Sequence, residues 1–224
     1  MSSEKQFLAL RLEGPLQSWG FDSQYNRRNT GLMPTKSAVA GMCCAALGWS
    51  RGSDEEKQFL LSFQLVRMTA IAIPRKIGIK DLAVRRLLDY HTVQNTKKAG
   101  GGIKKSHITH RQYLSDAAFG VLLEAESDFL EEIGAALVDP VWGLWLGRKT
   151  CIPSSPVFAG IKKERADALV LLIGDKTLES FTRQEEVENF SDGRDSLPDQ
   201  VVTFASRQRL FSPRRVQTRQ AGEE

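Results

Sequence analysis

Lysine, histidine and tyrosine side chains in the middle of the sequence could support acid–base chemistry on RNA. Lys105 and His107 are two residues apart, so they share one face if this segment is a β-strand. His107 can act as a general base toward a 2′-hydroxyl, and Lys105 can stabilise a charged phosphate. A tyrosine such as Tyr25, Tyr90 or Tyr113 would be the third group. The same residues can equally hold RNA without cutting it, so both alternatives stay open.

No pattern typical of a metal or cofactor site occurs in the sequence. His107 and His110 have no carboxylate or cysteine next to them that would complete a set of zinc ligands. Walker, G-x-S-x-G and H-E-x-x-H motifs are absent, and the glycines form no dinucleotide fingerprint. Three cysteines without paired spacing argue against a disulfide framework. We therefore expect no metal and no cofactor, with Cys43 in the core.

Positive charge is concentrated in short segments. Residues 75–113 contain ten Lys or Arg and two Asp, a net charge of +8, whereas the whole chain carries +4 and its remainder therefore −4. Cations neutralise phosphates and planar rings stack on unpaired bases, so this composition predicts binding of single-stranded RNA. A solvated basic arm is the alternative. Further basic or aromatic positions that fit the prediction are Trp19, Tyr25, Arg27, Arg28, Lys36, Tyr90, His91, Arg148 and Lys149.

The composition is that of an ordinary globular chain. Hydrophobic residues make up 41% and charged residues 26% of 224 residues. No apolar run approaches the roughly 18 residues of a membrane span, and the first residues are polar. We therefore expect a cytoplasmic protein that does not bind a membrane.

The elements that would position the basic residues begin with a strand and a helix. Leu8, Leu10 and Leu12 alternate with polar or small residues, as in a strand with one buried face. Thr35 or Ser37 can cap a helix whose apolar residues recur at helical spacing until Gly48. Because Arg27, Arg28 and Lys36 precede or open this helix, its first turn favours anions such as phosphate.

The order of the expected elements predicts an α+β fold of the ferredoxin-like (RRM-like) type. A palm would comprise residues 1–74 and 114–224, and a long basic β-hairpin thumb would comprise residues 75–113. Residues 168–173 and 200–204 compete as the closing strand, and the former also fits a helix. We expect residues 177–197 to form a surface loop or insertion, and the arginine-rich last twenty residues to be mobile unless a partner holds them.

Several segments together resemble the Cas-five family, the CasD-type subunits of type I-E CRISPR Cascade complexes. They occur in order along nearly the whole chain, which makes the resemblance specific. The segments are L-R-L-E-G-P-L-Q-S-W-G at 10–20, P-T-K-S-A-V-A-G at 34–41, D-Y-H-T-V at 89–93, K-S-H at 105–107, R-Q-Y-L-S-D-A-A-F at 111–119, L-G-R-K-T-C at 146–151 and F-A-S-R at 204–207.

The resemblance implies a non-catalytic, RNA-binding subunit for antiviral defence. Such subunits hold the 5′ handle of the CRISPR RNA, cap a filament of CasC subunits and dock the large CasA subunit, so that target DNA is met only through the complex. Carried over by motif, the RNA contacts would be Gln17, Trp19, Lys36, Ser37, Tyr90, His91, Lys105, His107, Arg148 and Lys149. The basic residues Arg27, Arg28, Lys104 and Arg207 complete the expected set of RNA contacts.

Two alternatives remain beside this interpretation. Type I-C relatives are metal-independent endoribonucleases that process precursor CRISPR RNA with a lysine–histidine pair that is typically adjacent. Here Ser106 separates Lys105 from His107, so catalysis by Lys105, His107 and Tyr90 is the second hypothesis. A scaffold that joins only protein subunits is the third.

Overall fold

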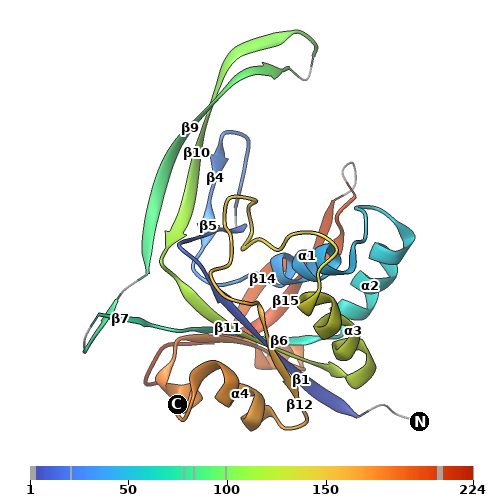
Figure 1. Ribbon diagram of the computed structural model, residues 1–224, viewed down its shortest axis with the longest axis vertical. Coiled ribbons are helices and arrows are strands. Elements are labelled where there is room, and N and C mark those ends of the chain that lie inside the picture. Colours follow the sequence, from blue (N-terminus) through green and yellow to red (C-terminus); the bar gives the residue numbers. More distant parts are fainter. Residues whose placement is uncertain are drawn as a thin grey trace.

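The computed structural model describes residues 4–20, 22–77, 79–82, 84–98, 100–205 and 209–223. These residues form a body of sheet and helices from which one long hairpin projects (Figure 1). The α+β class predicted from the sequence is confirmed. Among the helices of the described residues, none has the length and apolar character needed to cross a membrane.

The main sheet is antiparallel and has the strand order β12-β1-β11-β6-β13-β15-β14. Its strands are β1 (Lys5–Glu13), β6 (Arg67–Ala72), β11 (Ala118–Glu126), β12 (Phe158–Lys162), β13 (Arg183–Glu186), β14 (Asp195–Thr203) and β15 (Leu210–Arg219).

The projecting part is built on a second sheet of four strands. Its long hairpin consists of β9 (Arg85–Lys97) and β10 (Ile103–Ser115), and β10 also pairs with β2 (Leu16–Gln17) and β4 (Arg27–Arg28). Two further pairs are β3 (Trp19–Gly20) with β5 (Thr30–Gly31), and β7 (Arg75–Ile77) with β8 (Lys80–Leu82).

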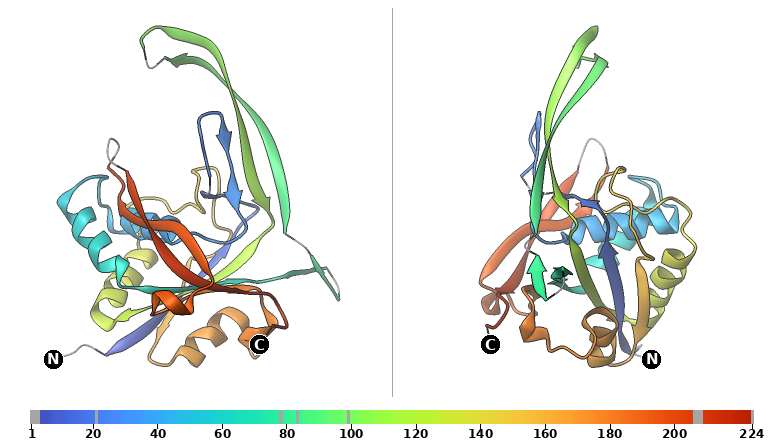
Figure 2. Two further views of the ribbon diagram at one scale, coloured as in Figure 1. Left: turned by 180° about the vertical axis from the view of Figure 1, so that it is seen from behind. Right: turned by 60° about the vertical axis from the view of Figure 1, so that its left-hand side comes forward.

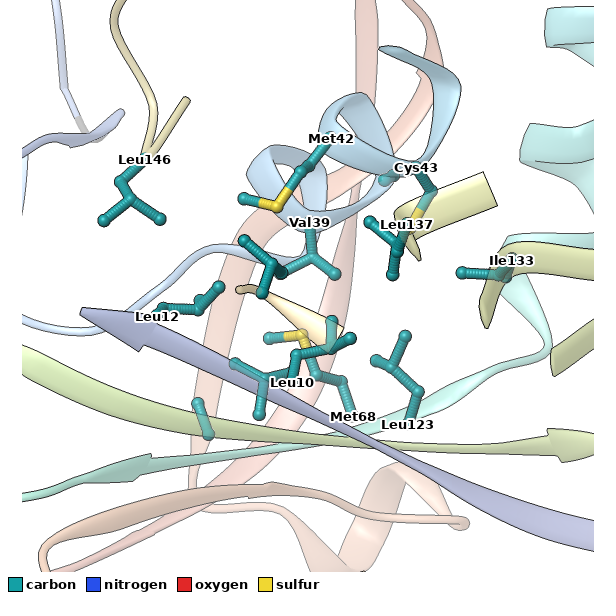
Figure 3. Packing of buried hydrophobic residues seen from close by; sticks show 14 of the residues in the cluster. Leu10, Leu12, Val39, Met42, Cys43, Met68, Leu123, Ile133, Leu137 and Leu146 are labelled. Carbon is teal, nitrogen blue, oxygen red and sulfur yellow. The ribbon is translucent and has the colours of Figure 1, made fainter. Parts of the chain in front are cut away.

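Helices cover both faces of the main sheet. They are α1 (Lys36–Leu47), α2 (Asp54–Gln64), α3 (Ser127–Val138) and α4 (Arg165–Ile173), with short 3-10 helices η1 (Leu178–Ser180) and η2 (Phe190–Asp192). Leu8, Leu10 and Leu12 of β1 are buried in a cluster with residues of α1, α2 and α3. Figure 3 shows Leu10 and Leu12 in this cluster, below Val39 and Met42 of α1. Ala9, on the opposite face, belongs to a smaller cluster with α4. Successive side chains of β1 therefore point alternately into two hydrophobic clusters, one on each face of the sheet.

The ends of α1 match the sequence pattern. Thr35, rather than Ser37, caps the helix, and its hydroxyl accepts a hydrogen bond from Ala38 N. Gly48 ends the helix with φ of 75°, a left-handed conformation that favours glycine. A Cβ at Gly48 would lie 2.7 Å from Val141 Cγ1, so the loop after α3 also depends on this glycine.

Neither candidate segment forms the closing strand beside β1, and the helical alternative for residues 168–173 is confirmed. Residues 168–173 are helical, in α4, and residues 200–203 belong to β14 at the far edge of the sheet. The strand beside β1 is β12, whose pairing shifts register between Ala9 and Leu10. Gly160 in β12 has φ of 145°, and an irregular five-residue strand of this kind gives little alternation for a sequence pattern to reveal.

The C-terminal third is more ordered than the sequence predicted. Residues 183–186, expected in a surface loop, form β13 and pair with both β6 and β15. The tail contains β15, which pairs with β13 and β14 and buries Val216 and Arg214. Residues 210–219 of the arginine-rich tail are therefore part of the main sheet, because neighbouring strands pair with their backbone and a carboxylate pairs with the buried Arg214 guanidinium.

A buried ion network joins the start of α1 to this C-terminal part of the sheet. Lys36 Nζ lies 2.8 Å from Glu186 Oε1, and Lys36 N donates to Asp199 Oδ2 at 2.9 Å. Arg214 donates to both Asp199 oxygens, from Nε at 2.6 Å and from Nη2 at 3.0 Å. The loss of hydration on burial lowers the pKa of Lys36, whereas the negative charges of Glu186 and Asp199 act in the opposite direction. These carboxylates therefore offset part of the cost of burying the ammonium.

We predict that Asp199→Ala destabilises the protein by about 3 kcal/mol, because it leaves the buried Arg214 without its main partner. Urea denaturation followed by circular dichroism measures the change. Asp195→Ala, at an exposed position of the same strand, is the matched control and should change the free energy of unfolding by less than about 0.5 kcal/mol. Equal effects of the two substitutions would contradict the role given to Asp199.

The thiols provide a second test of the packing. Burial, together with the nearby Glu56, raises the pKa of Cys44 to about 12, and burial also raises the pKa values of Cys43 and Cys151. At pH 8 a pKa of 12 leaves about a thousandfold less thiolate than the usual value near 9. We expect iodoacetamide to label the native protein very slowly and the urea-unfolded protein rapidly; fast labelling of a native thiol would contradict this core.

Candidate nucleic-acid interface

The hairpin presents two distinct faces because its strands pair in a regular register. Opposite residues have numbers that sum to 200, as in Tyr90 with His110 and Val93 with His107, and opposite side chains share a face. Tyr90 and His110 are both exposed, with ring centroids 5.2 Å apart in an edge-on arrangement. One face therefore carries an exposed aromatic pair halfway along the hairpin.

A third strand, β4, widens the hairpin at this point, and β4, β9 and β10 together are called the ribbon. β4 pairs in parallel with β10, placing Arg27 beside His110 and Arg28 beside Arg111, and His110 N donates to Asn26 O at 2.8 Å. Arg27 thus extends the Tyr90–His110 pair across three strands. The order tyrosine, histidine, arginine offers stacking surface and positive charge in one row.

Arg148 holds the loop between α3 and β12 against this ribbon. Its guanidinium donates to Gln112 O at 3.0 Å and to Arg28 O at 2.8 Å, and it lies 4.7 Å from the ring centroid of Tyr113. Arg148 therefore ties together β10, β4 and the loop that carries Lys149. Figure 1 shows this loop, in gold, beside β4 and β5. Lys149 is exposed, and its ammonium lies 5.6 Å from the Trp145 ring.

The structure separates the predicted contact residues into a group along the ribbon that solvent can reach and a group inside the body. Exposed or half-buried positions along the ribbon and its adjoining loop are Arg27, Arg28, Tyr90, His91, Lys104, Lys105, His107, Arg148 and Lys149. His91 is partly exposed, with Nδ1 3.8 Å from Asp89 Oδ2. Arg207 lies outside the described residues.

Three predicted contacts are corrected because their side chains are buried. Gln17 Nε2 donates to Leu12 O at 3.0 Å and to Ala117 O at 2.7 Å, so it joins strand ends inside the body. Trp19 packs edge-on against Phe119 within the core.

Lys36 is the third correction, and Ser37 beside it faces its own helix cap. The ammonium of Lys36, 1% exposed, belongs to the ion network with Glu186. Ser37 is half-buried, and its hydroxyl donates to Thr35 Oγ1 at 3.3 Å. The P-T-K-S segment therefore anchors the helix start within the fold.

The proposed catalytic group is not assembled along the hairpin. Tyr90 lies opposite His110, three residues beyond His107 and hence about 10 Å along the strand, with its side chain on the other face. The ammonium that approaches His107 Nδ1, at 3.5 Å, comes from Lys104 and not from Lys105. Among the described residues, no cluster of three His, Cys, Asp or Glu side chains has the arrangement of a metal site.

Residues that the sequence interpretation missed lie on the same ribbon. The sequence predicts for His110 only a possible role as a metal ligand, and for Arg111 only a contribution to the net charge. Both positions follow from a turn centred on residue 100, because the hairpin then pairs residues 90 and 110. Trp142 and Trp145, beside Lys149, gave no signal in the sequence because their loop lacks a regular pattern.

Comparisons with known proteins identify the class of this chain. The model of a family described as CRISPR-associated protein (Cas_Cas5) matches residues 7–217. The CRISPR system Cascade subunit CasD of Escherichia coli (strain K12) is 32% identical over 161 residues, covering 70% of this chain and 71% of that protein.

Two solved structures extend the likeness to three dimensions. A chain of a CRISPR RNA-guided surveillance complex shares the fold, with a TM-score of 0.73, 24% identity and coverage of 95% of this chain and 89% of that one. A structure described as a Cas protein gives a TM-score of 0.66, 31% identity and coverage of 96% and 94%. The chain is thus a CRISPR-associated protein. Within that class it belongs to the Cas5 family.

We predict that Arg148→Met loosens the β4 segment, because it removes two hydrogen bonds to backbone carbonyls. Trypsin should cleave after Arg27 or Arg28 several times faster than in the wild type, and the free energy of unfolding should fall by about 1–2 kcal/mol. Lys149→Met, at the exposed neighbouring position, should change neither quantity. Mass spectrometry of the trypsin fragments measures the cleavage rate. An unchanged rate in Arg148→Met would contradict the role of this guanidinium.

Proposed function

We propose that this chain is a non-catalytic RNA-binding subunit of a CRISPR Cascade surveillance complex of type I-E, which holds the 5′ handle of the CRISPR RNA. The observation that carries the proposal is the row formed by Tyr90, His110 and Arg27 across three strands of a projecting ribbon. Exposed rings and cations in one row suit an unpaired strand, whose bases stack while its phosphates are neutralised.

The relatives support the partners in this proposal. The similar protein from Escherichia coli is a Cascade subunit, and a chain of similar fold belongs to an RNA-guided surveillance complex. The partners are then the CRISPR RNA, CasC subunits that form the filament capped by this chain, and the CasA subunit. Target DNA is reached indirectly, and the complex acts in the cytoplasm.

The palm and thumb are part of the same proposal. The order β12-β1-β11-β6, with α1 and α2 between β1 and β6 and α3 between β11 and β12, supports a ferredoxin-like palm. Residues 75–113 would be the thumb inserted into it, with residues 1–74 and 114–224 as the palm. The hairpin stands away from the body in each view (Figure 2), as expected of a part that contacts a separate molecule.

Binding without cleavage is the outcome that tests the proposal. The purified chain should retard a radiolabelled repeat RNA from the CRISPR array of the source organism, and the RNA should stay intact after long incubation with or without a chelator. Affinity should fall with salt by roughly 0.7 log units per log unit for each phosphate contact. Product bands that disappear in His107→Ala would instead identify a ribonuclease.

A charge reversal with a matched control tests where the RNA binds. Arg27→Glu combined with Arg28→Glu should weaken binding about tenfold or more and reduce the salt slope by roughly 1.4. Lys162→Glu combined with Lys163→Glu reverses two exposed cations at the end of β12, away from the hairpin (Figure 1), and should have a much smaller effect. Equal losses of affinity in the two double variants would contradict this interface. RNA binding that neither double variant weakens would also contradict it and would favour a protein scaffold.

A further inference from the structure

A groove at the surface of the body is lined by several aromatic side chains. It lies between α1 and the loop that joins α3 to β12, and its volume is about 530 Å³. Met42 of α1 and Phe204 at the end of β14 form part of it. Its indole walls come from Trp49, Trp142 and Trp145, with Arg51 and Lys149 among the lining residues. Trp142 is 42% exposed, so a large apolar surface is left open to a ligand.

The groove is held open by backbone contacts and by small residues of α1. Val141 N donates to Ala46 O at 2.9 Å and Trp142 N to Ala45 O at 3.1 Å, which fixes the loop to the end of the helix. Gly41 lies on the groove side of α1, where a Cβ would approach the Phe204 ring to 3.4 Å. The space therefore exists in the folded chain without rearrangement, as is usual for small-molecule sites.

The chemistry of the lining selects a flat ligand that carries negative charge. Indole rings offer stacking surfaces, and the Lys149 ammonium lies 5.6 Å from the Trp145 ring centroid, where it can also meet a phosphate. The carboxylate of Glu56, which also lines the groove, is engaged by Gly52 N at 2.7 Å. An apolar side chain of a partner protein would contact the rings but would not pair with the Arg51 and Lys149 cations.

The position of the groove connects it to the ribbon. Lys149 follows Arg148, whose guanidinium contacts the backbone of β10 and β4. Arg148 therefore connects the loop that lines the groove to β4, the strand that carries Arg27 and Arg28. A strand bound along the ribbon can direct a base into the groove while Lys149 neutralises the adjoining phosphate.

We propose that this groove binds one unpaired nucleobase of the bound RNA, which stacks on the exposed Trp142. The inference rests on the proposed RNA-binding function and adds a defined base pocket to it. Stacking on an aromatic side chain is typically worth about 1–3 kcal/mol per base, which corresponds to an affinity change of about 5- to 150-fold.

A double-mutant cycle between protein and RNA tests the pocket. The repeat RNA is made as a series in which each nucleotide in turn is abasic, and binding is measured with the wild type and with Trp142→Ala. We expect one abasic position to weaken wild-type binding by about 5- to 150-fold and to have little further effect in Trp142→Ala. Trp142→Phe, which keeps a ring, should restore most of the affinity.

Phe190→Ala is the matched control, because Phe190 is an exposed aromatic residue on η2, outside the lining of the groove. It should change neither the affinity nor the abasic profile. If Trp142→Ala fails to fold, quenching of wild-type tryptophan fluorescence provides the same test. Intact RNA should then quench more than RNA with the critical abasic position.

The outcomes separate the two proposals. Absence of RNA binding by the wild type overturns both. Normal binding with strictly additive losses in every combination overturns the base pocket and leaves the RNA-binding function standing. Unchanged RNA affinity in Trp142→Ala, together with loss of a protein subunit from the reconstituted complex, would assign the groove to a protein partner and overturn the pocket.

Discussion

The fold depends on a buried ion network at the start of α1. Asp199 accepts hydrogen bonds from Lys36 N and from the Arg214 guanidinium, while Glu186 lies against the Lys36 ammonium. These residues come from α1, β13, β14 and β15, so the network joins the N-terminal helix to the last strands of the sheet. Each charge is buried only because the others are present, which makes the arrangement specific and intolerant of a single loss.

The ribbon is stabilised by its base rather than by its own core. Two strands in isolation are marginal in water, and most side chains of β9 are exposed. β10 continues into the body, where Tyr113 and Leu114 are buried, and β4 and Arg148 support it from the side. This division leaves the outer part free to present rings and cations, while the lower part fixes where they point.

Positive charge serves two different purposes in this chain. Arg214 and Lys36 are buried and paired with carboxylates, whereas Arg27, Arg28 and Lys149 are exposed. In the proposed function only the second group meets RNA. The arrangement of His107 with Lys104, and of Tyr90 with His110, offers contacts along a strand but does not bring an acid, a base and a phosphate-stabilising cation to one point.

The sequence by itself determined the parts whose signals are local. Alternation in β1, a helix cap at Thr35 or Ser37, the end of α1 at Gly48 and the charge of residues 75–113 each depend on neighbouring residues alone, and the family motifs are also read in sequence order. Tertiary structure decided the rest. Burial of Gln17, Trp19 and Lys36, the order of the tail in β15 and the meeting of Tyr90, His110 and Arg27 depend on partners far away in the chain. A basic residue looks the same in a sequence whether a carboxylate 150 residues away pairs with it or solvent surrounds it, and only the folded chain distinguishes the two.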